Sequence, residues 1–487
     1  MRYVIALDAG TTSVRAFVYE LKTGKFVHGA SQEIEQGFPR EGWVEQDANE
    51  IYYKAAYCLN ECVRFTGAEQ IGGIGIANQR ETVVLWDRKT GEPVCPAIVW
   101  QCRRTSDFCA SLSKEAVKEI RERTGLVPDA YFSASKIRWI LDNVPKAQTL
   151  LRQGRLAAGT VDSYLIFKLT NGRTFATDVT NASRTMLFNI HTLEWDETLL
   201  RIFNLPREIL PEVRPCDARM GEAEIAGTYV PVAGVLGDQQ AALFGQGCFD
   251  RGDGKITYGT GLFVLFNTGE TCAESRRGML CTVGYSAGGK TYYALEGSVF
   301  NAGSAVQWLR DGLGLIRTSA ESESVAECAE NNGGVYFVPA FTGLGAPYWD
   351  PRARGMFTGL TRSTNRAHMV RAVLESIAYS ARDLIACMEE DSGINLREIK
   401  CDGGASANNF LMQFQSDLLG VGINRPSERE STALGAALMC AVSLGEIPLQ
   451  EIPRLRRSER IFSPQGDREQ YNKLYREYRR AVERTLL

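Results

Sequence analysis

Two short apolar runs separated by a turn open the chain. Residues 3–7 and 16–19 are rich in β-branched and aliphatic side chains, and the turn between them holds Asp8 and Gly10. Apolar runs of this length that end in turn residues are typical of β-strands. We therefore predict a β-hairpin, which differs from the strand–turn–helix of a dinucleotide-binding fold.

The same pattern returns in the second half of the chain. A Gly-Thr-Gly turn at 259–261 again lies between two apolar, strand-like runs. Two such hairpins indicate two related halves, and the loop-like composition of residues 245–253 places the junction there. We predict one domain over residues 1–247 and a second over residues 248–487.

Apolar residues at helical spacing alternate with these strand-like runs. In the second half they predict helices over residues 301–313, 367–390, 408–419, 432–444 and 467–487. Strands that alternate with helices indicate the α/β class.

One segment imitates a nucleotide-binding motif. Residues 284–291 satisfy the P-loop pattern letter for letter. That motif needs a helix directly after it, so that backbone amides at the helix start can hold phosphate. Strand-like residues follow here instead, so we predict a hairpin turn at Gly288 and Gly289.

Composition and charge exclude several classes of protein. The chain is 44% hydrophobic and 23% charged, which is typical of a globular protein and not of a disordered one. Its 55 Lys and Arg against 58 Asp and Glu give no reason to expect a nucleic acid or anionic membrane as partner. Thirteen scattered cysteines predict reduced thiols. The first residues lack a signal-peptide pattern, and we expect a soluble, cytoplasmic protein.

The three Gly-rich turns are candidate phosphate sites. In the first turn, Thr11, Thr12 and Ser13 offer hydroxyls beside Gly10, and Asp8 can hold Mg²⁺ through water. The turn at 259–261 offers similar groups, and residues 402–409 form a third turn that opens a helix. Plain hairpins, and a helix capped by an Asn, explain the same residues equally well.

Acid–base and polyol chemistry have candidates as well. Asp238 follows an apolar run and can act as a general base or as a helix N-cap. The polar segment 78–81 ends in Arg80 and Glu81, which suit the hydroxyls of a polyol or form a surface ion pair. Three aromatic residues next to these turns either contact the carbon chain of a bound polyol or pack in the core: Trp100, Tyr131 and Phe263.

Several sequence blocks together resemble the FGGY carbohydrate kinases over essentially the full length of the chain. These blocks are ALDAGTTSVRA at 6–16, NQRET at 78–82, WQCRR at 100–104, GDQQAALFGQ at 237–246, YGTG at 258–261, GAPYWDP at 345–351 and DGGASANNFLMQFQSD at 402–417. Residues 131–143 and 355–375 fit the two general patterns of that family. The blocks NQRET, WQCRR and GAPYWDP point to glycerol as the substrate.

The resemblance implies an α/β protein with the actin-like ATPase (ribonuclease H-like) fold, in which two related domains flank a catalytic cleft. It implies a Mg²⁺-dependent transferase that uses ATP to phosphorylate glycerol to sn-glycerol 3-phosphate, the first step of glycerol catabolism. Members of the family are commonly homodimers or homotetramers.

The family's functional residues carry over onto matching positions of this chain. By resemblance, Asp238 is the general base and Asp8 organises Mg²⁺. The glycerol site would consist of Arg80, Glu81, Trp100, Tyr131, Asp238, Gln239 and Phe263. The nucleotide site would consist of Thr11, Thr12, Ser13, Arg15, Thr260, Gly303, Gln307, Gly404 and Asn408.

The chain also departs from some members of the family. Ala9 stands where a Gln is common, and residues 226–231 lack the Arg-containing loop that binds fructose 1,6-bisphosphate in some bacterial members. The histidine that other members offer for phosphorylation is missing too, so we expect neither form of regulation. Two other functions stay open: a kinase of the same family that acts on a pentulose or another polyol, and a catalytically silent nucleotide sensor.

Overall fold

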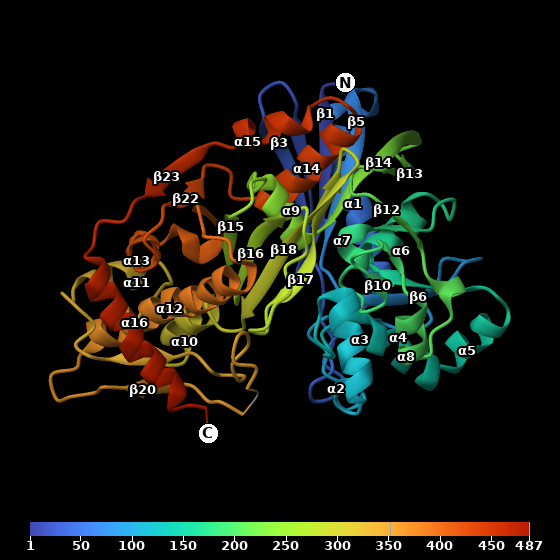
Figure 1. Cartoon of the computed structure of the whole chain (residues 1–487). Coiled ribbons are helices and arrows are strands. Elements are labelled where there is room, and N and C mark those ends of the chain that lie inside the picture. The colour runs from blue at the N-terminus through green and yellow to red at the C-terminus, as the bar shows by residue number, and fades with distance from the viewer. Residues whose placement is uncertain (351, 487) are drawn as a thin grey trace. The chain divides into compact units, whose positions relative to one another are not determined.

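The computed structural model describes residues 1–350 and 352–486. The chain divides into two compact units, whose elements are labelled in Figure 1. Unit 1 comprises Met1–Gly247, Cys281–Tyr293 and Glu430–Leu455, and unit 2 comprises Cys248–Leu280, Ala294–Arg429 and Arg456–Leu487. The unit changes at 247/248, where the sequence places the domain junction, but two later segments belong to unit 1.

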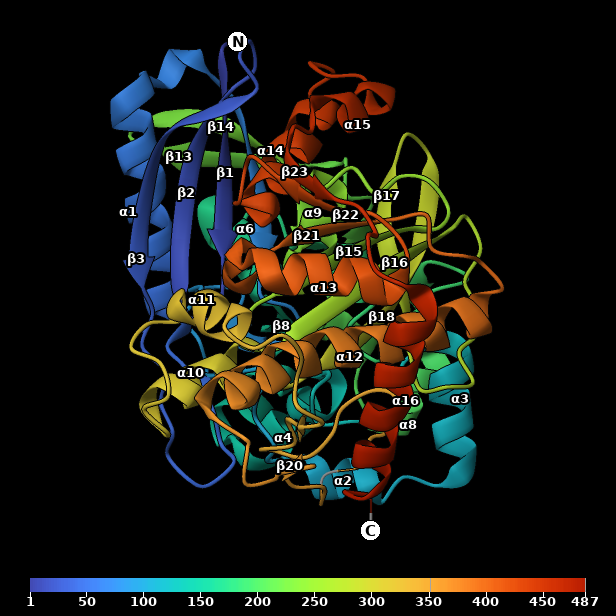
Figure 2. The ribbon, with the colours of Figure 1, turned by 90° about the vertical axis from the view of Figure 1, so that its left-hand side faces the viewer.

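A six-stranded sheet forms the core of unit 1. Its order is β13 (Arg219–Ile225), β14 (Thr228–Gly237), β5 (Ile71–Asn78), β1 (Tyr3–Ala9), β2 (Ser13–Glu20) and β3 (Lys25–Glu33). Strand β1 pairs antiparallel with β2 and parallel with β5, and β14 runs parallel with β5. Figure 2 shows β1, β2 and β3 side by side. The predicted first hairpin is confirmed.

Unit 2 repeats this arrangement. Next to the edge strand β17 (Leu280–Ala287), its sheet contains, in order, β18 (Lys290–Val299), β16 (Leu262–Gly269), β15 (Asp253–Tyr258), β21 (Glu398–Asp402), β22 (Ile423–Pro426) and β23 (Ser458–Phe462). Strand β15 pairs antiparallel with β16 and parallel with β21, and β22 runs parallel with β21. The neighbours of β15 thus match those of β1, which supports the prediction of two related halves.

Helices and short strands complete unit 1. The helices are α1 (Ala48–Thr66), α2 (Ser106–Ala110), α3 (Lys114–Thr124), α4 (Ser133–Asn143), α5 (Pro145–Arg152), α6 (Val161–Leu169), α7 (Val179–Ala182), α8 (Glu197–Phe203), α9 (Asp238–Gly245), α14 (Ser431–Ser443) and α15 (Ile452–Leu455). A four-stranded sheet has the order β4 (Glu45–Gln46), β7 (Ala97–Ile98), β6 (Val83–Asp87) and β8 (Leu156–Thr160). Two strand pairs are β9 (Ala176–Asp178) with β12 (Glu212–Arg214), and β10 (Phe188–Asn189) with β11 (Glu194–Trp195).

Small residues explain why α14 belongs to unit 1. A Cβ atom on Gly435 would lie 1.8 Å from the Ala241 carbonyl oxygen of α9, and one on Gly75 of β5 would lie 2.1 Å from the Ala436 carbonyl oxygen. Only glycine allows backbones to approach this closely. Helix α14 therefore packs directly on α9 and β5, although the sequence assigns its residues to the second domain.

Four of the helices that the sequence predicts lie in unit 2: α10 (Gly303–Asp311), α12 (Arg366–Ser392), α13 (Asn409–Leu419) and α16 (Arg468–Glu483). The short helix α11 (Glu321–Glu327), also in unit 2, was not predicted. A strand pair, β19 (Tyr336–Val338) with β20 (Met356–Thr358), lies outside the main sheet.

Three further sequence predictions can be compared with the structure. Strands β17 (Leu280–Ala287) and β18 are joined by Gly288 and Gly289 at φ +62° and +77°, which confirms a hairpin turn and excludes a P-loop. The prediction of reduced thiols is wrong for Cys272 and Cys281, which are disulfide-bonded. A low cysteine density excludes a disulfide framework but not an individual bond. Among the described residues, no helix is both long and apolar enough to span a bilayer.

Candidate active site

The polar residues of unit 1 gather where its parallel strands end. Asp8 lies near the carboxyl end of β1, Arg80 and Glu81 follow the end of β5, and Asp238 follows the end of β14. Because β1, β5 and β14 are parallel neighbours, these ends meet at one edge of the sheet. Ligands of α/β sheets commonly bind at this edge.

Arg80 connects the ends of β5 and β14. Its Nε lies 3.2 Å from Oδ1 of Asp238, and its NH1 group donates to Oε1 of Gln240 at 3.2 Å. The stem of Arg80 crosses Gly237 closely, since a Cβ atom there would lie 2.7 Å from the Arg80 Cδ. Glycine at 237 therefore gives Arg80 the space to reach Asp238.

The surroundings of Asp238 suit a general base. Burial raises the pKa of its carboxyl to about 6, against the opposing effect of Arg80. The negative charges of Glu81 and Asp8 also raise this pKa. Its side chain is still 28% exposed, so a ligand can reach it. A carboxyl with this pKa is ionised at neutral pH and is a stronger base than an ordinary aspartate.

Glu81 is buried, with 1% of its surface exposed. Its carboxylate accepts a hydrogen bond of 2.6 Å from Nε of Arg184. The nearest Arg80 nitrogen lies 3.9 Å from it, which is too far for a hydrogen bond. The alternative of a surface ion pair between Arg80 and Glu81 is therefore wrong, because both residues are interior and their partners come from distant segments.

Two of the three predicted aromatic residues lie together in unit 1. The rings of Trp100 and Tyr131 meet edge to face, with centroids 5.7 Å apart, and both residues are partly exposed. Trp100 also donates from Nε1 to Oγ1 of Thr11 at 3.0 Å, which ties it to the first turn. Phe263 is on β16 of unit 2 and is partly buried.

Two ion pairs of Arg15 stabilise the first turn. Arg15 donates to Asp8 and to Glu430, at 2.6 Å in each case. Burial raises the pKa of Asp8, which is 4% exposed, although Arg15 opposes this rise. The Gly10 amide donates to the Ser13 carbonyl at 3.0 Å and closes the turn. Thr12 is exposed and can reach a ligand.

The carboxylate of Asp8 is a ligand that suits Mg²⁺. Among residues 1–350 and 352–486, no group of three or more His, Cys, Asp or Glu could enclose a metal ion. Mg²⁺ rarely needs such a group, because it keeps several waters and binds one or two carboxylates together with substrate phosphates.

The second turn, in unit 2, is fixed by backbone hydrogen bonds. The Gly303 amide donates to the Gly259 carbonyl at 3.0 Å, and the Ala302 and Ser304 amides donate to the Thr260 carbonyl at 2.9 and 3.1 Å. A Cβ atom on Gly303 would lie 2.5 Å from the Gly259 oxygen. The start of α10 therefore lies directly against this turn. Thr260 and Gln307 are exposed, as ligand-binding residues need to be.

The third turn, also in unit 2, follows β21. Gly403 adopts φ +85°, and a Cβ atom there would lie 2.5 Å from the Tyr258 carbonyl oxygen. Asn408 is the N-cap of α13 and accepts from the Leu411 amide at 2.9 Å, so the capping interpretation is confirmed. Gly404 is exposed. A nucleotide role for Gly404 and Asn408 stays a prediction.

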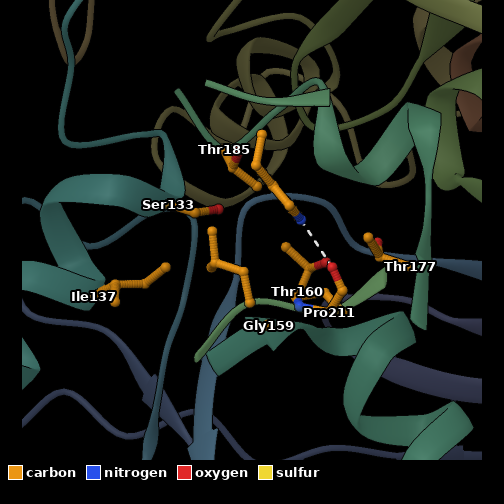
Figure 3. A pocket seen from close by; sticks show the side chains of 9 residues that line it. Ser133, Ile137, Gly159, Thr160, Thr177, Thr185 and Pro211 are labelled. Atoms are coloured by element: carbon orange, nitrogen blue, oxygen red, sulfur yellow. Dashed lines mark hydrogen bonds between the residues drawn. The ribbon is translucent and has the colours of Figure 1, made fainter. Parts of the chain in front are cut away.

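A cavity in unit 1 is too small to be the substrate site. The volume open to the centre of a water molecule is ≈ 10 Å³, about enough for a single water. Figure 3 shows its lining, which includes Ser133, Thr160, Thr177 and Thr185. Beside it, buried Asp162 accepts from Thr160 at 2.5 Å and from Thr177 at 2.7 Å, and burial raises its pKa to about 7.

Reasoning from the sequence missed several residues that support the site. They are Lys136, Arg184, Gln240 and Glu430. Lys136 lies inside the segment 131–143, which carries the family resemblance, but Lys136 and Arg184 are both far in sequence from Glu81, which they contact. Glu430 is 415 residues from Arg15, and no local sequence pattern predicts that these two residues form an ion pair.

Comparisons with known proteins agree with this arrangement. The model of the N-terminal domain of the FGGY family of carbohydrate kinases matches residues 3–245, and that of the C-terminal domain matches residues 254–444. A protein of Treponema denticola named glycerol kinase is 52% identical over 100% of this chain and 99% of its own length. A protein of Thermotoga maritima named glycerol kinase 2 is also 52% identical over the same shares.

Solved structures show the same fold. A crystal structure of Plasmodium falciparum glycerol kinase with ADP superimposes with a TM-score of 0.94 at 38% identity, covering 100% of this chain and 99% of that one. A xylulose kinase of Lactobacillus acidophilus gives a TM-score of 0.89 at 23% identity, covering 99% and 98%. At that identity the likeness concerns the fold alone.

Proposed function

This chain belongs to the FGGY family of carbohydrate kinases, and from that premise we propose that it uses ATP to phosphorylate glycerol to sn-glycerol 3-phosphate. The predicted actin-like ATPase fold of this family is confirmed. The observation that carries the proposed substrate is the buried cluster at the strand ends of unit 1. There Arg80 contacts Asp238 at 3.2 Å, and Glu81 lies next in the chain. Full-length relatives named glycerol kinase support the proposal.

Asp238 is the proposed general base. It accepts the proton of one terminal hydroxyl of glycerol, and the oxygen then attacks the γ-phosphorus of ATP while ADP leaves. Arg80, Glu81 and Gln239 would hold the hydroxyl groups. Trp100 and Tyr131, which meet edge to face, would pack against the carbon chain, and Phe263 would complete that wall. Positioning and charge neutralisation supply most of the catalysis in phosphoryl transfer.

The Gly-rich turns are the proposed nucleotide site. Thr11, Thr12, Ser13 and Arg15 of unit 1 would contact phosphate groups, and the corresponding residues of unit 2 are Thr260, Gly303, Gln307, Gly404 and Asn408. Asp8 would hold Mg²⁺ through water, and a bound Mg²⁺ would neutralise charge on the phosphates. Arg15 donates to Asp8 at 2.6 Å and opposes the rise in the pKa of its carboxyl that burial causes.

A coupled assay of ADP release tests the proposal. The intact protein is assayed with Mg·ATP alone and then with glycerol, erythritol, xylulose or ribulose. We expect turnover that depends on glycerol, with a kcat/KM at least about 100-fold above that of the other three, because unmatched buried polar groups penalise a wrong hydroxyl pattern. Turnover of a pentulose alone would keep the family and reject the substrate. Without turnover of any of them, the nucleotide-sensor alternative would replace the proposal.

Location and assembly remain predictions from the family. We infer a cytoplasmic enzyme that forms homodimers or homotetramers. Light scattering of the purified protein, at concentrations around that used in the assay, gives the oligomeric state directly. A monomer at every concentration would contradict this part of the proposal.

A further inference from the structure

Glu81 has an unusual backbone conformation for its residue type. It adopts φ +59° without being glycine, and the Thr82 amide donates to the Arg80 carbonyl at 2.7 Å across it. This closes a tight three-residue turn with Glu81 at its centre. A non-glycine residue at positive φ costs about 1 kcal/mol or more and persists only where the surroundings hold it.

Two buried cations hold this residue from different segments. Arg184, just after α7, donates to the Glu81 carboxylate at 2.6 Å. Lys136 of α4 donates to the Glu81 carbonyl at 3.2 Å, and Ser133 of the same helix donates to that carbonyl at the same distance. Both cations are 0% exposed. The carboxylate and the peptide carbonyl of Glu81 are therefore each anchored by a charged donor.

The same two cations also contact Tyr131. Lys136 donates to the Tyr131 carbonyl at 2.5 Å, and the Arg184 guanidinium carbon lies 5.7 Å from the centre of the Tyr131 ring. This ring meets Trp100 edge to face. Lys136 and Arg184 thus connect the proposed hydroxyl ligand Glu81 to the aromatic wall of the same site.

The cost of this arrangement argues for a role beyond general stability. Burial lowers the pKa of Lys136 to about 7, so keeping its side chain charged in the interior is costly. An apolar side chain of similar size often stabilises an interior better than a buried charge does. A buried lysine that donates to the carbonyls of two site residues fits a positional requirement instead.

We propose that Lys136 and Arg184 are positioning residues that hold Glu81 and Tyr131 in the geometry required to bind glycerol. Neither cation needs to touch the substrate, because each acts through a residue of the site. The inference rests on the proposed function and deepens it, since it attributes part of the affinity for glycerol to two residues behind the site, Lys136 on α4 and Arg184 after α7.

Steady-state kinetics with separate KM values provide the test. The variants are Lys136→Met, Arg184→Met and Arg184→Lys, each assayed with glycerol and with Mg·ATP. We expect both methionine variants to raise KM for glycerol at least about 10-fold and to leave KM for ATP within about twofold. Arg184→Lys keeps a charged donor, so it should recover part of the loss. A role in stability alone would not produce this split or this rescue.

Two additions keep the test decisive if a variant folds poorly. Ser133→Ala removes a neutral donor to the same carbonyl and should raise KM for glycerol by about threefold, a loss typical of one neutral hydrogen bond. Asp87→Asn is the control. Asp87 is a buried charge at the far end of β6, paired with Arg155 at 3.1 Å. We expect it to lower the unfolding temperature without changing KM for glycerol.

A readout without turnover separates the possible failures. Glycerol alone should raise the unfolding temperature of the wild type and raise it less in Lys136→Met and Arg184→Met. If folded variants keep the wild-type KM and the wild-type shift, the positioning role is wrong while the proposed function stands. If glycerol affects neither turnover nor unfolding of the wild type, both proposals fail.

Discussion

The two units share a strand order, but they differ in the chemistry at the ends of their strands. In unit 1 the turn after β1 is held by a chain of charges, in which Arg15 contacts both Asp8 and Glu430 at 2.6 Å. In unit 2 the corresponding turn after β15 is held by backbone hydrogen bonds from the start of α10. Topology therefore sets where ligands can bind, while the side chains at the turns decide what chemistry is possible.

This difference indicates that the two units have different chemical roles. Unit 1 combines buried charges that can bind hydroxyls and accept a proton, notably Arg80 and Asp238. Unit 2 offers small exposed residues and backbone groups, which suit a nucleotide but cannot perform acid–base catalysis.

The largest expected effect on KM comes from a pair of variants, one in each unit. Arg80→Ala removes a charged donor from the proposed glycerol site and should raise KM for glycerol about 100-fold, with KM for ATP within about twofold. Asn408→Ala should instead raise KM for ATP about 10-fold and spare glycerol. Because Asn408 also caps α13, its unfolding temperature is measured as a control. If both variants shift both KM values equally, the division between units is wrong.

A smaller effect is expected from the glycine beside Arg80. Gly237→Ala would place a methyl group 2.7 Å from the Arg80 Cδ, so the guanidinium must move away from Asp238. We expect kcat/KM for glycerol to fall about 10- to 100-fold, as for misplaced catalytic groups. Gly37→Ala is the matched control, since its new Cβ would meet its nearest neighbour at 3.7 Å. Equal activity in both variants would contradict the proposed position of Arg80.

The pH profile tests the proposed base without any substitution. Burial raises the pKa of Asp238 to about 6, and a general base must be ionised to act. We therefore expect kcat/KM for glycerol to be flat near neutral pH and to fall about tenfold per pH unit below pH 6. A profile that stays flat down to pH 5 would exclude Asp238 as a base with this pKa.

The smallest effect concerns a buried acid outside the site. Asp162 has a pKa raised to about 7 by burial, so its protonated form stabilises the folded state, and this contribution is lost as the pH rises from about 4 through 7. Asn at this position does not titrate, so the gap in unfolding free energy between Asp162→Asn and the wild type should shift by about 2–3 kcal/mol in favour of the variant between pH 5 and pH 8. Glycerol turnover should persist. A gap that does not change with pH would contradict this account of Asp162.

Local patterns in the sequence were sufficient for the hairpins and for the Gly-rich turns. Gly10, Gly259 and Asn408 lie at turns whose residue types predict a break after a strand, and the structure has such breaks there. The P-loop pattern at 284–291 could be rejected for the same reason, since a strand follows it. These features depend on neighbours within a few residues.

Contacts between distant segments could not be predicted in this way. Arg184 and Glu81 are 103 residues apart, and only the fold shows that they form a buried pair. The return of α14 to unit 1 depends on Gly435 fitting against Ala241, which no periodicity reveals. The burial of Arg80 could not be predicted either, because a polar segment is typical of the protein surface and only the tertiary packing shows that this one is interior.

The most direct test of the central claim compares the wild type with Asp238→Asn in the coupled ADP-release assay. We predict that glycerol stimulates ADP release by the wild type, and that the variant loses about 1,000-fold or more in kcat because it lacks the proton acceptor. Glycerol should still raise the unfolding temperature of the variant, since Arg80 and Glu81 remain. Glycerol-dependent turnover that survives in Asp238→Asn would contradict the account.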